Sequence, residues 1–458
     1  MSPALRTMND TTTGDLAAVE QIGEFQRMLP GPDWLVDLRA AALGKFNASE
    51  WPTTSEEEWR RTNLSPFEFD LYRFPRTCIE AALPPLVAPE SETPLREGIA
   101  GRLEVDSGAA REVRVRDDLR DAGVVFGDLA SCLGDASRTG GDRAKGAMVE
   151  AVRGAMERSL AIADNRLQYW HFAIVSNPVV LYVPAGVRID EPFEVALAYA
   201  GDEVVYAPHL VVVLEQESSA TVVRRISSTE EGEVLLVDGS ELLVGDGARL
   251  HYTDLMQMND EALVFRNDRG NVGRDGHIHR TDAALGADFV KTRYVSELTG
   301  PGADAVLNGL YFAVDEQHMD VRTVQQHRAP HTTSRAHYRG AVGDESHAIY
   351  QGLIQVDGTA RGTDAYLTNK NLILGESARA DSIPSLNIKT DDVRCSHGST
   401  TGKIDPDQVF YLGTRGYSAT EALRMLVEGH FEDLIRQTPE SIQDELRALI
   451  IARTPEEL

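Results

Sequence analysis

The side chains with the clearest chemical potential in this sequence are a cysteine and a histidine two positions apart. They are Cys395 and His397, within the segment DDVRCSHGSTTG at residues 391–402. The segment is typical of the end of a β-strand, where side chains at i and i+2 leave the same face. A thiolate and an imidazole placed in this way can bind one iron or zinc ion, with Asp391 and Asp392 as nearby oxygen ligands.

Two ligands do not complete such a site, because tetrahedral zinc and iron–sulfur clusters usually take four protein ligands. The pair therefore belongs either to a site shared across a subunit interface or to no site. In the second case Cys395 is a small buried hydrophobe beside a hydrogen-bonded His397. A Cys/His nucleophile is the enzymatic alternative, but the sequence marks neither an oxyanion hole nor a third orienting group.

The remaining histidine groups have no cysteine or acid at a spacing that would complete a metal site. We therefore expect hydrogen-bonded or surface histidines at His277, His279, His318, His327, His331 and His337.

The elements that must position Cys395 and His397 are mainly strands. Residues 169–402 contain short pieces rich in Val, Leu, Ile and Tyr, separated by Gly, Asp or Asn, as in Leu353 to Val356 followed by Asp357-Gly358. The spacing of these turns is irregular, so a sandwich and a barrel stay open beside a solenoid. The length of the stretch without a clear break favours the solenoid.

Helical patterns flank this β region on both sides. We predict an N-terminal helical region over 1–82, in which Ser55 and Glu58 can form a capping box. A linker and mixed α/β segment follows over 83–168, with prolines near its start and a helix over 145–164. The C-terminal helical region covers 403–458.

The last region contains an amphipathic helix whose apolar stripe includes Leu423, Leu426 and Phe431. Ser418 and Glu421 form a capping box at its start. The helix either caps the end of the β region, as solenoids require, or docks a partner protein.

Composition excludes several classes of function. The chain of 458 residues has 72 Asp and Glu against 45 Lys and Arg, a net charge of −27, and no Lys/Arg-rich run. We therefore expect neither nucleic acid nor an anionic membrane as a partner. No phosphate-binding P-loop or dinucleotide motif occurs. Three cysteines and no recognisable signal peptide predict a cytoplasmic protein in a reducing compartment.

Several segments together form a recognisable pattern over about residues 50–436. They are EEEWRRTNL at 56–64, VVLYVPAGVRIDEPFEV at 179–195, QQHRAPHTTSRAHYRG at 325–340, TNKNLILGESARADSIPSLNI at 368–388 and DDVRCSHGSTTGKIDPDQVFYLGTRG at 391–416. With these segments the chain resembles the SufB/SufD family of the SUF iron–sulfur cluster assembly system. The C-S-H-G block is similar to the SufD branch, whereas SufB carries Glu-His-Glu there and a further cysteine on an earlier strand, which residues 379–386 lack.

The resemblance implies a right-handed parallel β-helix between helical terminal regions, and a non-catalytic scaffold subunit of a SufBCD complex that also supports iron acquisition. It implies SufB as heterodimer partner, with a homodimer when the chain is alone, and a SufC ATPase docked on the C-terminal helical region. His397 would join a SufB cysteine in holding a nascent iron–sulfur cluster, with Cys395 as the weaker ligand. A SufB-like homodimeric scaffold is the alternative, and a β-helix enzyme acting on polysaccharide is the weakest one.

Overall fold

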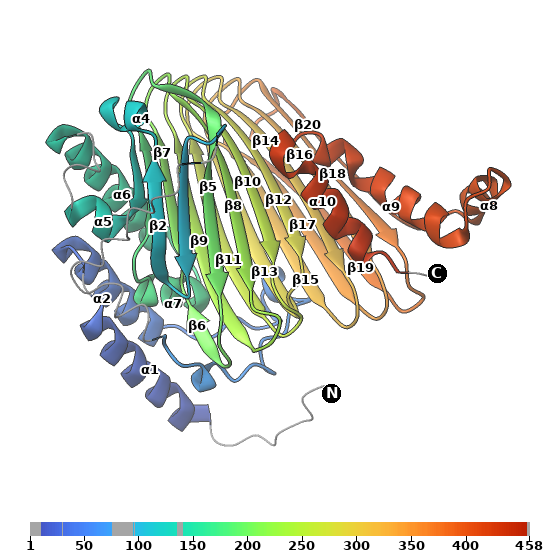
Figure 1. Ribbon diagram of the computed structural model, residues 1–458, viewed down its shortest axis with the longest axis horizontal. Helices are drawn as coiled ribbons and strands as arrows, with labels where there is room; N and C mark the ends of the chain where they lie inside the picture. The colour runs from blue at the N-terminus through green and yellow to red at the C-terminus, as the bar shows by residue number, and fades with distance from the viewer. Residues whose placement is uncertain (1–10, 30, 76–94, 96, 135–140, 456–458) are drawn as a thin grey trace.

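The structure, a computed structural model, describes residues 11–29, 31–75, 95, 97–134 and 141–455 (Figure 1). Its centre is a parallel β-solenoid of about eight turns with helices at both ends of the chain. The prediction of a mainly β fold with a β-helix core is therefore confirmed, and the sandwich and barrel alternatives are wrong. No helix among these residues is long and apolar enough to cross a membrane.

Two sheets form the walls of the solenoid, and the chain passes from one to the other in each turn. We call the first sheet B; its strand order is β2 (Ala109–Val115), β1 (Gly101–Asp106), β5 (Arg188–Tyr199), β8 (Ser219–Ser228), β10 (Arg249–Gln257), β12 (His277–Leu285), β14 (Asp304–Ala313), β16 (Thr333–Val342), β18 (Thr363–Ile373) and β20 (Val393–Lys403). Sheet A has the order β19 (Arg379–Ile388), β17 (His347–Val356), β15 (His318–His327), β13 (Phe289–Leu298), β11 (Leu263–Val272), β9 (Val234–Val244), β7 (His209–Leu214), β4 (Val179–Val183) and β3 (Val125–Asp128), and β6 (Val204–Tyr206) also pairs with β9.

The turns of the solenoid differ slightly in length, which explains the irregular spacing in the sequence. In sheet B, His277 lies beside Asp304, which in turn lies beside Thr333. These partners are 27 and 29 residues apart, so no strict repeat exists. Glycines at positive φ, such as Gly302, make several of the tight corners, since only glycine adopts this backbone conformation without steric cost.

Alternate side chains along each strand point into the solenoid and pack with those of the next turn. Tyr338 stacks on Tyr350 across the interior, with ring centroids 4.7 Å apart. A Cβ atom at Gly309 would overlap the Tyr338 ring, and one at Gly340 would overlap the Tyr311 ring. These glycines therefore provide the space for the interior tyrosines.

The helices of the N-terminal half gather at one end of the solenoid (Figure 1). Arg39 fixes this layer: its buried guanidinium donates from Nε to the Val175 carbonyl oxygen at 2.7 Å and from Nη2 to the Ser176 carbonyl oxygen at 2.5 Å. The helices are α1 (Thr11–Met28), α2 (Asp33–Asn47), α4 (Asp117–Asp121), α5 (Leu129–Gly134), α6 (Asp142–Ile162) and α7 (Arg166–Ile174). α6 agrees closely with the helix predicted over 145–164.

The described residues after α2, 48–75, follow the outer face of sheet A. Lys291 Nζ donates to the Glu58 carbonyl oxygen at 2.8 Å, and the Thr62 hydroxyl donates to Asp320 at 2.5 Å. The helix expected to begin at the Ser55–Glu58 capping box is only one 3₁₀ turn, η1 (Glu57–Trp59), and a second turn, η2 (Phe69–Leu71), follows. No side chain caps η1, so the predicted Ser55–Glu58 box is wrong.

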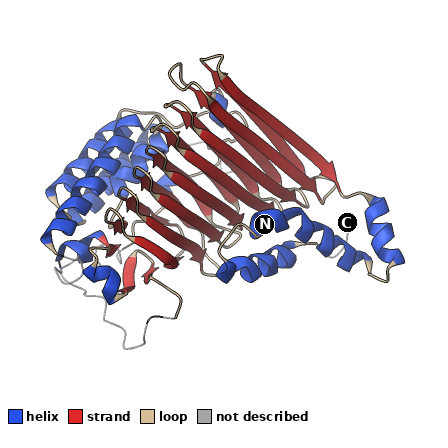
Figure 2. Cartoon of the chain, turned by 90° about the horizontal axis from the view of Figure 1, so that it is seen from above, coloured by secondary structure: helices blue, strands red, loops and turns tan. Residues whose placement is uncertain are grey.

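Three helices close the chain: α8 (Pro406–Thr414), α9 (Ala419–Ile435) and α10 (Glu440–Arg453). The capping box of Ser418 and Glu421 at the start of α9 is confirmed. α9 and α10 pack on the outer face of sheet B, where the Phe431 and Phe312 rings lie 6.2 Å apart. They leave the end of the solenoid at β19 and β20 uncovered, so the expectation of a terminal cap is wrong (Figure 2).

Replacing Phe431 by alanine should test this packing. The side chain is fully buried, so the variant should lose about 3–5 kcal/mol of stability through lost burial and a residual cavity. Met425→Ala on the same helix is the control, because this side chain is 42% exposed and should change stability by less than about 0.5 kcal/mol. Chemical denaturation of both variants measures the difference; equal midpoints would contradict the assigned packing.

Candidate functional site

Cys395 and His397 lie on β20, the last strand of sheet B. This strand pairs only with β18, where Ala365 is the neighbour of Cys395 and Leu367 is the neighbour of His397. Ala365 and Leu367 are both buried in the solenoid interior. Since parallel neighbours share an orientation, Cys395 and His397 both face the interior at its open end. The predicted common face of the pair is thus confirmed.

The two side chains differ in accessibility. Cys395 is half-buried against the end of the hydrophobic core, and this burial raises the pKa of its thiol. His397 is exposed to solvent. A raised thiol pKa reduces the thiolate fraction, and the thiolate is the form that binds metal. His397 is therefore the more available ligand of the two.

The rest of the open end combines unpaired backbone with apolar side chains. β19 pairs only with β17, and β20 only with β18, so each strand has one free edge among the described residues. Ile388 and Val393 pack partly buried against the core, and Leu386 is exposed. Free edges with apolar neighbours are typical of a surface that pairs with another strand.

The described part of the chain does not by itself assemble a metal site. Among the residues that the structure describes, no three His, Cys, Asp or Glu side chains are grouped so that they could hold a metal ion. Asp391 and Asp392 lie in the turn before β20 and are exposed. The roles of His397 and Cys395 as ligands stay predictions.

Most of the other histidines have hydrogen-bond or ring partners. His327 is buried between two hydroxyls, with Nδ1 2.7 Å from Thr332 Oγ1 and Nε2 2.8 Å from Ser334 Oγ, and burial lowers its pKa to about 4. His318 is within 3.2 Å of the Thr62 hydroxyl, His277 is beside Asp304, His279 is beside Asn308, His337 is near the Tyr366 ring, and His331 occupies a turn at positive φ.

The residues proposed from the sequence for partner docking pack within this chain. Leu423 and Phe431 are buried against sheet B, and Leu426 is partly buried beside them. Their docking role stays a prediction, and the isolated chain does not present Leu423 or Phe431 on its surface.

Sequence reasoning missed an exposed aromatic surface next to these helices. Phe410 and Tyr411 on α8 are 73% and 56% exposed, and Tyr417 and Met425 are also exposed. We call these four side chains the α8 surface. α8 projects away from both sheets in Figures 1 and 2. Adjacent aromatic residues in a helix of nine residues were the available signal, since a short helix buries only one face.

A second feature missed from the sequence lies inside the solenoid. Arginine and aspartate alternate with one residue between them on two strands, as Arg266 and Asp268 on β11 and as Arg280 and Asp282 on β12. The sequence predicts that the two residues of each pair share one face of their strand, but it does not predict that this face points into the solenoid.

Comparison with known proteins connects this geometry to a family. Residues 197–430 match the family described as SUF system FeS cluster assembly, SufBD core domain. A SufBD family protein of Mycobacterium bovis is 31% identical over 63% of this chain and 74% of its own length. The assembly protein SufD of Bacillus subtilis is 25% identical over 96% and 99%, and SufD of Escherichia coli 30% over 57% and 61%. The chain therefore belongs to the SufBD family of the SUF iron–sulfur cluster assembly system.

Proposed function

We propose that this protein is the SufD-like subunit of a SufBCD complex, a scaffold that helps to build and transfer nascent iron–sulfur clusters and supports iron acquisition. The observation that carries the proposal is the open end of the solenoid, where an inward-facing His397 lies on a strand with a free edge. A cytoplasmic location belongs to the same proposal and is supported by the low number of cysteines.

The open end supports a partner that is itself a β-solenoid. β19 and β20 offer backbone groups without strand partners, and the exposed Leu386 adds apolar area at the same end. A strand from a second solenoid would satisfy these backbone groups and bury this area. We assign this position to SufB, with a second copy of this chain as the occupant when SufB is absent.

In such a pair the nascent cluster is cargo held between the two chains. His397 contributes one imidazole nitrogen, Cys395 is a weaker second ligand, and SufB supplies the remaining ligands. The incomplete ligand set of this chain supports sharing, because clusters usually require four ligands.

The chain has a non-catalytic role in this proposal, and ATP hydrolysis belongs to a SufC partner. The sequence contains no phosphate-binding loop that would support ATP hydrolysis by this chain. The α8 surface is the docking position that we assign to SufC, since exposed aromatic side chains are enriched at protein interfaces. Movement of SufC would reach the solenoid through α9, whose Phe431 contacts Phe312 of β14. Cluster ligands at the open end would then be exposed or protected by nucleotide-driven motion.

His397→Ala should abolish cluster formation without harming the fold. The side chain is exposed, so its loss should change stability by less than about 0.5 kcal/mol. Complexes purified anaerobically with the variant should contain much less iron and sulfide than wild type, while gel filtration shows normal assembly. Cys395→Ser should reduce cluster content less. His331→Ala, at a solenoid corner, is the control and should retain the cluster.

Normal iron and sulfide in an assembled His397→Ala complex would refute the ligand role. An equal loss in both variants would make Cys395 a full ligand.

Phe410→Glu should prevent docking of the ATPase. It adds a charge to the α8 surface, which must lose water in an interface, and desolvating an unpaired carboxylate is costly. Val36→Glu is the matched control, because Val36 is also exposed, at 46%, but lies on α2 near the other end of the solenoid.

Co-purification with SufC measures the effect: Phe410→Glu should lose SufC while SufB pairing remains, and Val36→Glu should keep both. Retention of SufC by Phe410→Glu would remove α8 from the docking surface. The same preparations test the non-catalytic role, because ATP turnover should appear only when SufC is present.

A further inference from the structure

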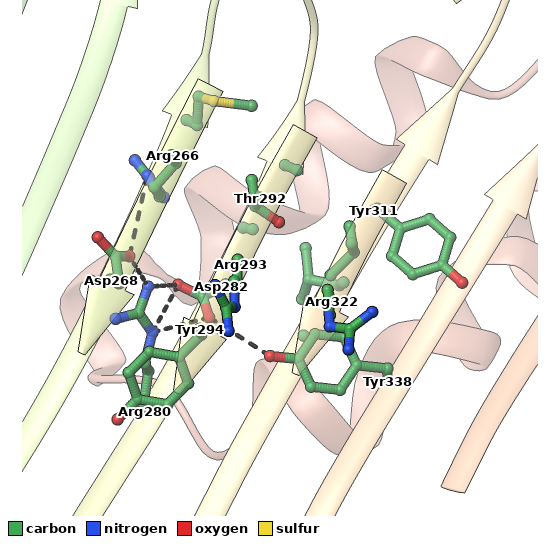
Figure 3. A pocket seen from close by; sticks show the side chains of 16 residues that line it. Arg266, Asp268, Arg280, Asp282, Thr292, Arg293, Tyr294, Tyr311, Arg322 and Tyr338 are labelled. Carbon is green, nitrogen blue, oxygen red and sulfur yellow. Dashed lines mark hydrogen bonds and ion pairs between the residues drawn. The ribbon is translucent and has the colours of Figure 1, made fainter. Parts of the chain in front are cut away.

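The interior of the solenoid contains a cluster of charged side chains that the proposed function does not use. Figure 3 shows part of it around Arg280. The cluster joins five strands of sheet B and sheet A, β8 to β12, near the middle of the solenoid and contains three arginines and four aspartates: Arg224, Arg266, Arg280, Asp238, Asp254, Asp268 and Asp282.

Four of these side chains form a balanced group. Arg224 Nη2 is 2.9 Å from Asp238, and its Nε is 2.5 Å from Asp254. Arg266 contacts the same two carboxylates, at 2.7 Å from Asp238 and 3.0 Å from Asp254. Two guanidinium groups therefore face two carboxylates, and the positive and negative charges cancel.

The other part of the cluster is not balanced. Arg280 lies between Asp268 and Asp282, contacting Asp268 Oδ2 through Nη2 and approaching Asp282 Oδ1 to 2.7 Å. One guanidinium thus faces two carboxylates. If both were ionised, the buried cluster would have an unpaired negative charge, which is costly in a protein interior.

No other charge nearby restores the balance. Arg293 and Arg322 also line the cavity beside Arg280, but they interact with Glu58 and Asp164. The other titratable side chains near the cluster are neutral. Burial raises the pKa values of four tyrosines: Tyr252 on β10, Tyr294 on β13, Tyr311 on β14 and Tyr338 on β16. Burial lowers the pKa values of His171, which interacts with Asp238, and of His209, which interacts with Arg224.

A small cavity lies beside Arg280, Asp268 and Asp282. Its size and its charged lining favour the binding of a proton over that of a metal cation. Its free volume is about 30 Å³, enough for a water molecule. Arg280 Nη1 and Asp268 Oδ1 line it without hydrogen-bond partners among the described residues. A water can accept from the first and donate to the second, whereas the guanidinium would repel a metal cation.

We propose that the solenoid interior binds one proton at neutral pH and that Asp282 holds it. Asp268 lies 4.0 Å from Arg266 in addition to its contact with Arg280, whereas among the described residues Arg280 alone forms an ion pair with Asp282. Asp282 also lines the cavity, with Oδ2 3.5 Å from the Tyr338 hydroxyl.

The electrostatic environments of the carboxyls agree with this assignment. Burial raises the pKa of Asp282 despite the opposing effect of Arg280. Burial also acts on Asp268, but Arg280 and Arg266 together lower its pKa below the usual range.

Because the folded chain holds this proton, its stability against unfolding should decrease as the pH rises. In the unfolded chain an aspartate ionises near its ordinary pKa of about 3.9. Above this pH the unfolded state releases the proton that the folded state keeps, so the unfolding constant contributed by Asp282 rises about tenfold per pH unit. The rise ends where pH passes the raised pKa of folded Asp282.

Infrared spectroscopy of the full chain labelled with carboxyl-¹³C aspartate tests the proposal directly. At pH 7 the wild type should show a protonated aspartic acid band that is missing from Asp282→Asn. The label excludes Glu241, whose pKa burial raises to about 8. Absence of the band in wild type would overturn the proposal, and a band that persists in Asp282→Asn would overturn the assignment to Asp282.

The pH dependence of stability gives an independent readout. Above about pH 4 the wild type should lose stability relative to Asp282→Asn as the pH rises. The ratio of the wild-type unfolding constant to that of the variant should increase by as much as tenfold per pH unit. Asp254→Asn is the matched control: it removes a carboxylate from the balanced group and should weaken folding at every pH between 5 and 9. A constant difference between Asp282→Asn and wild type over this range would contradict proton binding.

Discussion

The arrangement of this protein depends on backbone hydrogen bonding between successive turns of the solenoid. Each internal strand forms backbone hydrogen bonds with the strands on both of its sides, as β12 does with β10 and β14. The last turn has no further strand, so β19 and β20 keep free edges. Because α9 and α10 lie on the flank of sheet B, nothing in the described chain covers these edges. The end of the molecule at β19 and β20 is therefore suited to pairing.

This constraint also explains where the cluster ligands would lie. Inward-facing positions of the internal turns are mostly buried, as at Leu367, but the corresponding position in the last turn is open, as at His397. A residue there has the fixed orientation of a core side chain and the accessibility of a surface one. Rigid placement with an open coordination side is what a shared metal site requires.

The local pattern of alternation and turn residues was sufficient for a mainly β fold and for the common face of Cys395 and His397. It left a sandwich and a barrel open beside a solenoid, and the β-helix followed from the family resemblance. It did not reveal that α9 packs on a flank, since the stripe with Leu423 and Phe431 fits either position. The charged interior was also missed. Arg280 and Asp282 look like surface residues in the sequence, and only their pairing with Asp268 across the two sheets makes an interior position stable.

Amide hydrogen exchange at the open end tests the central claim most directly. Measured on the chain alone at high dilution and again in complex with SufB, the amides of β20 and β19 should change from rapid to slow exchange when a partner strand pairs with them. Amides of β12, which are hydrogen-bonded within the solenoid, should exchange equally slowly in both states. Unchanged rapid exchange at β20 in the complex would show that the partner binds elsewhere and would contradict this account.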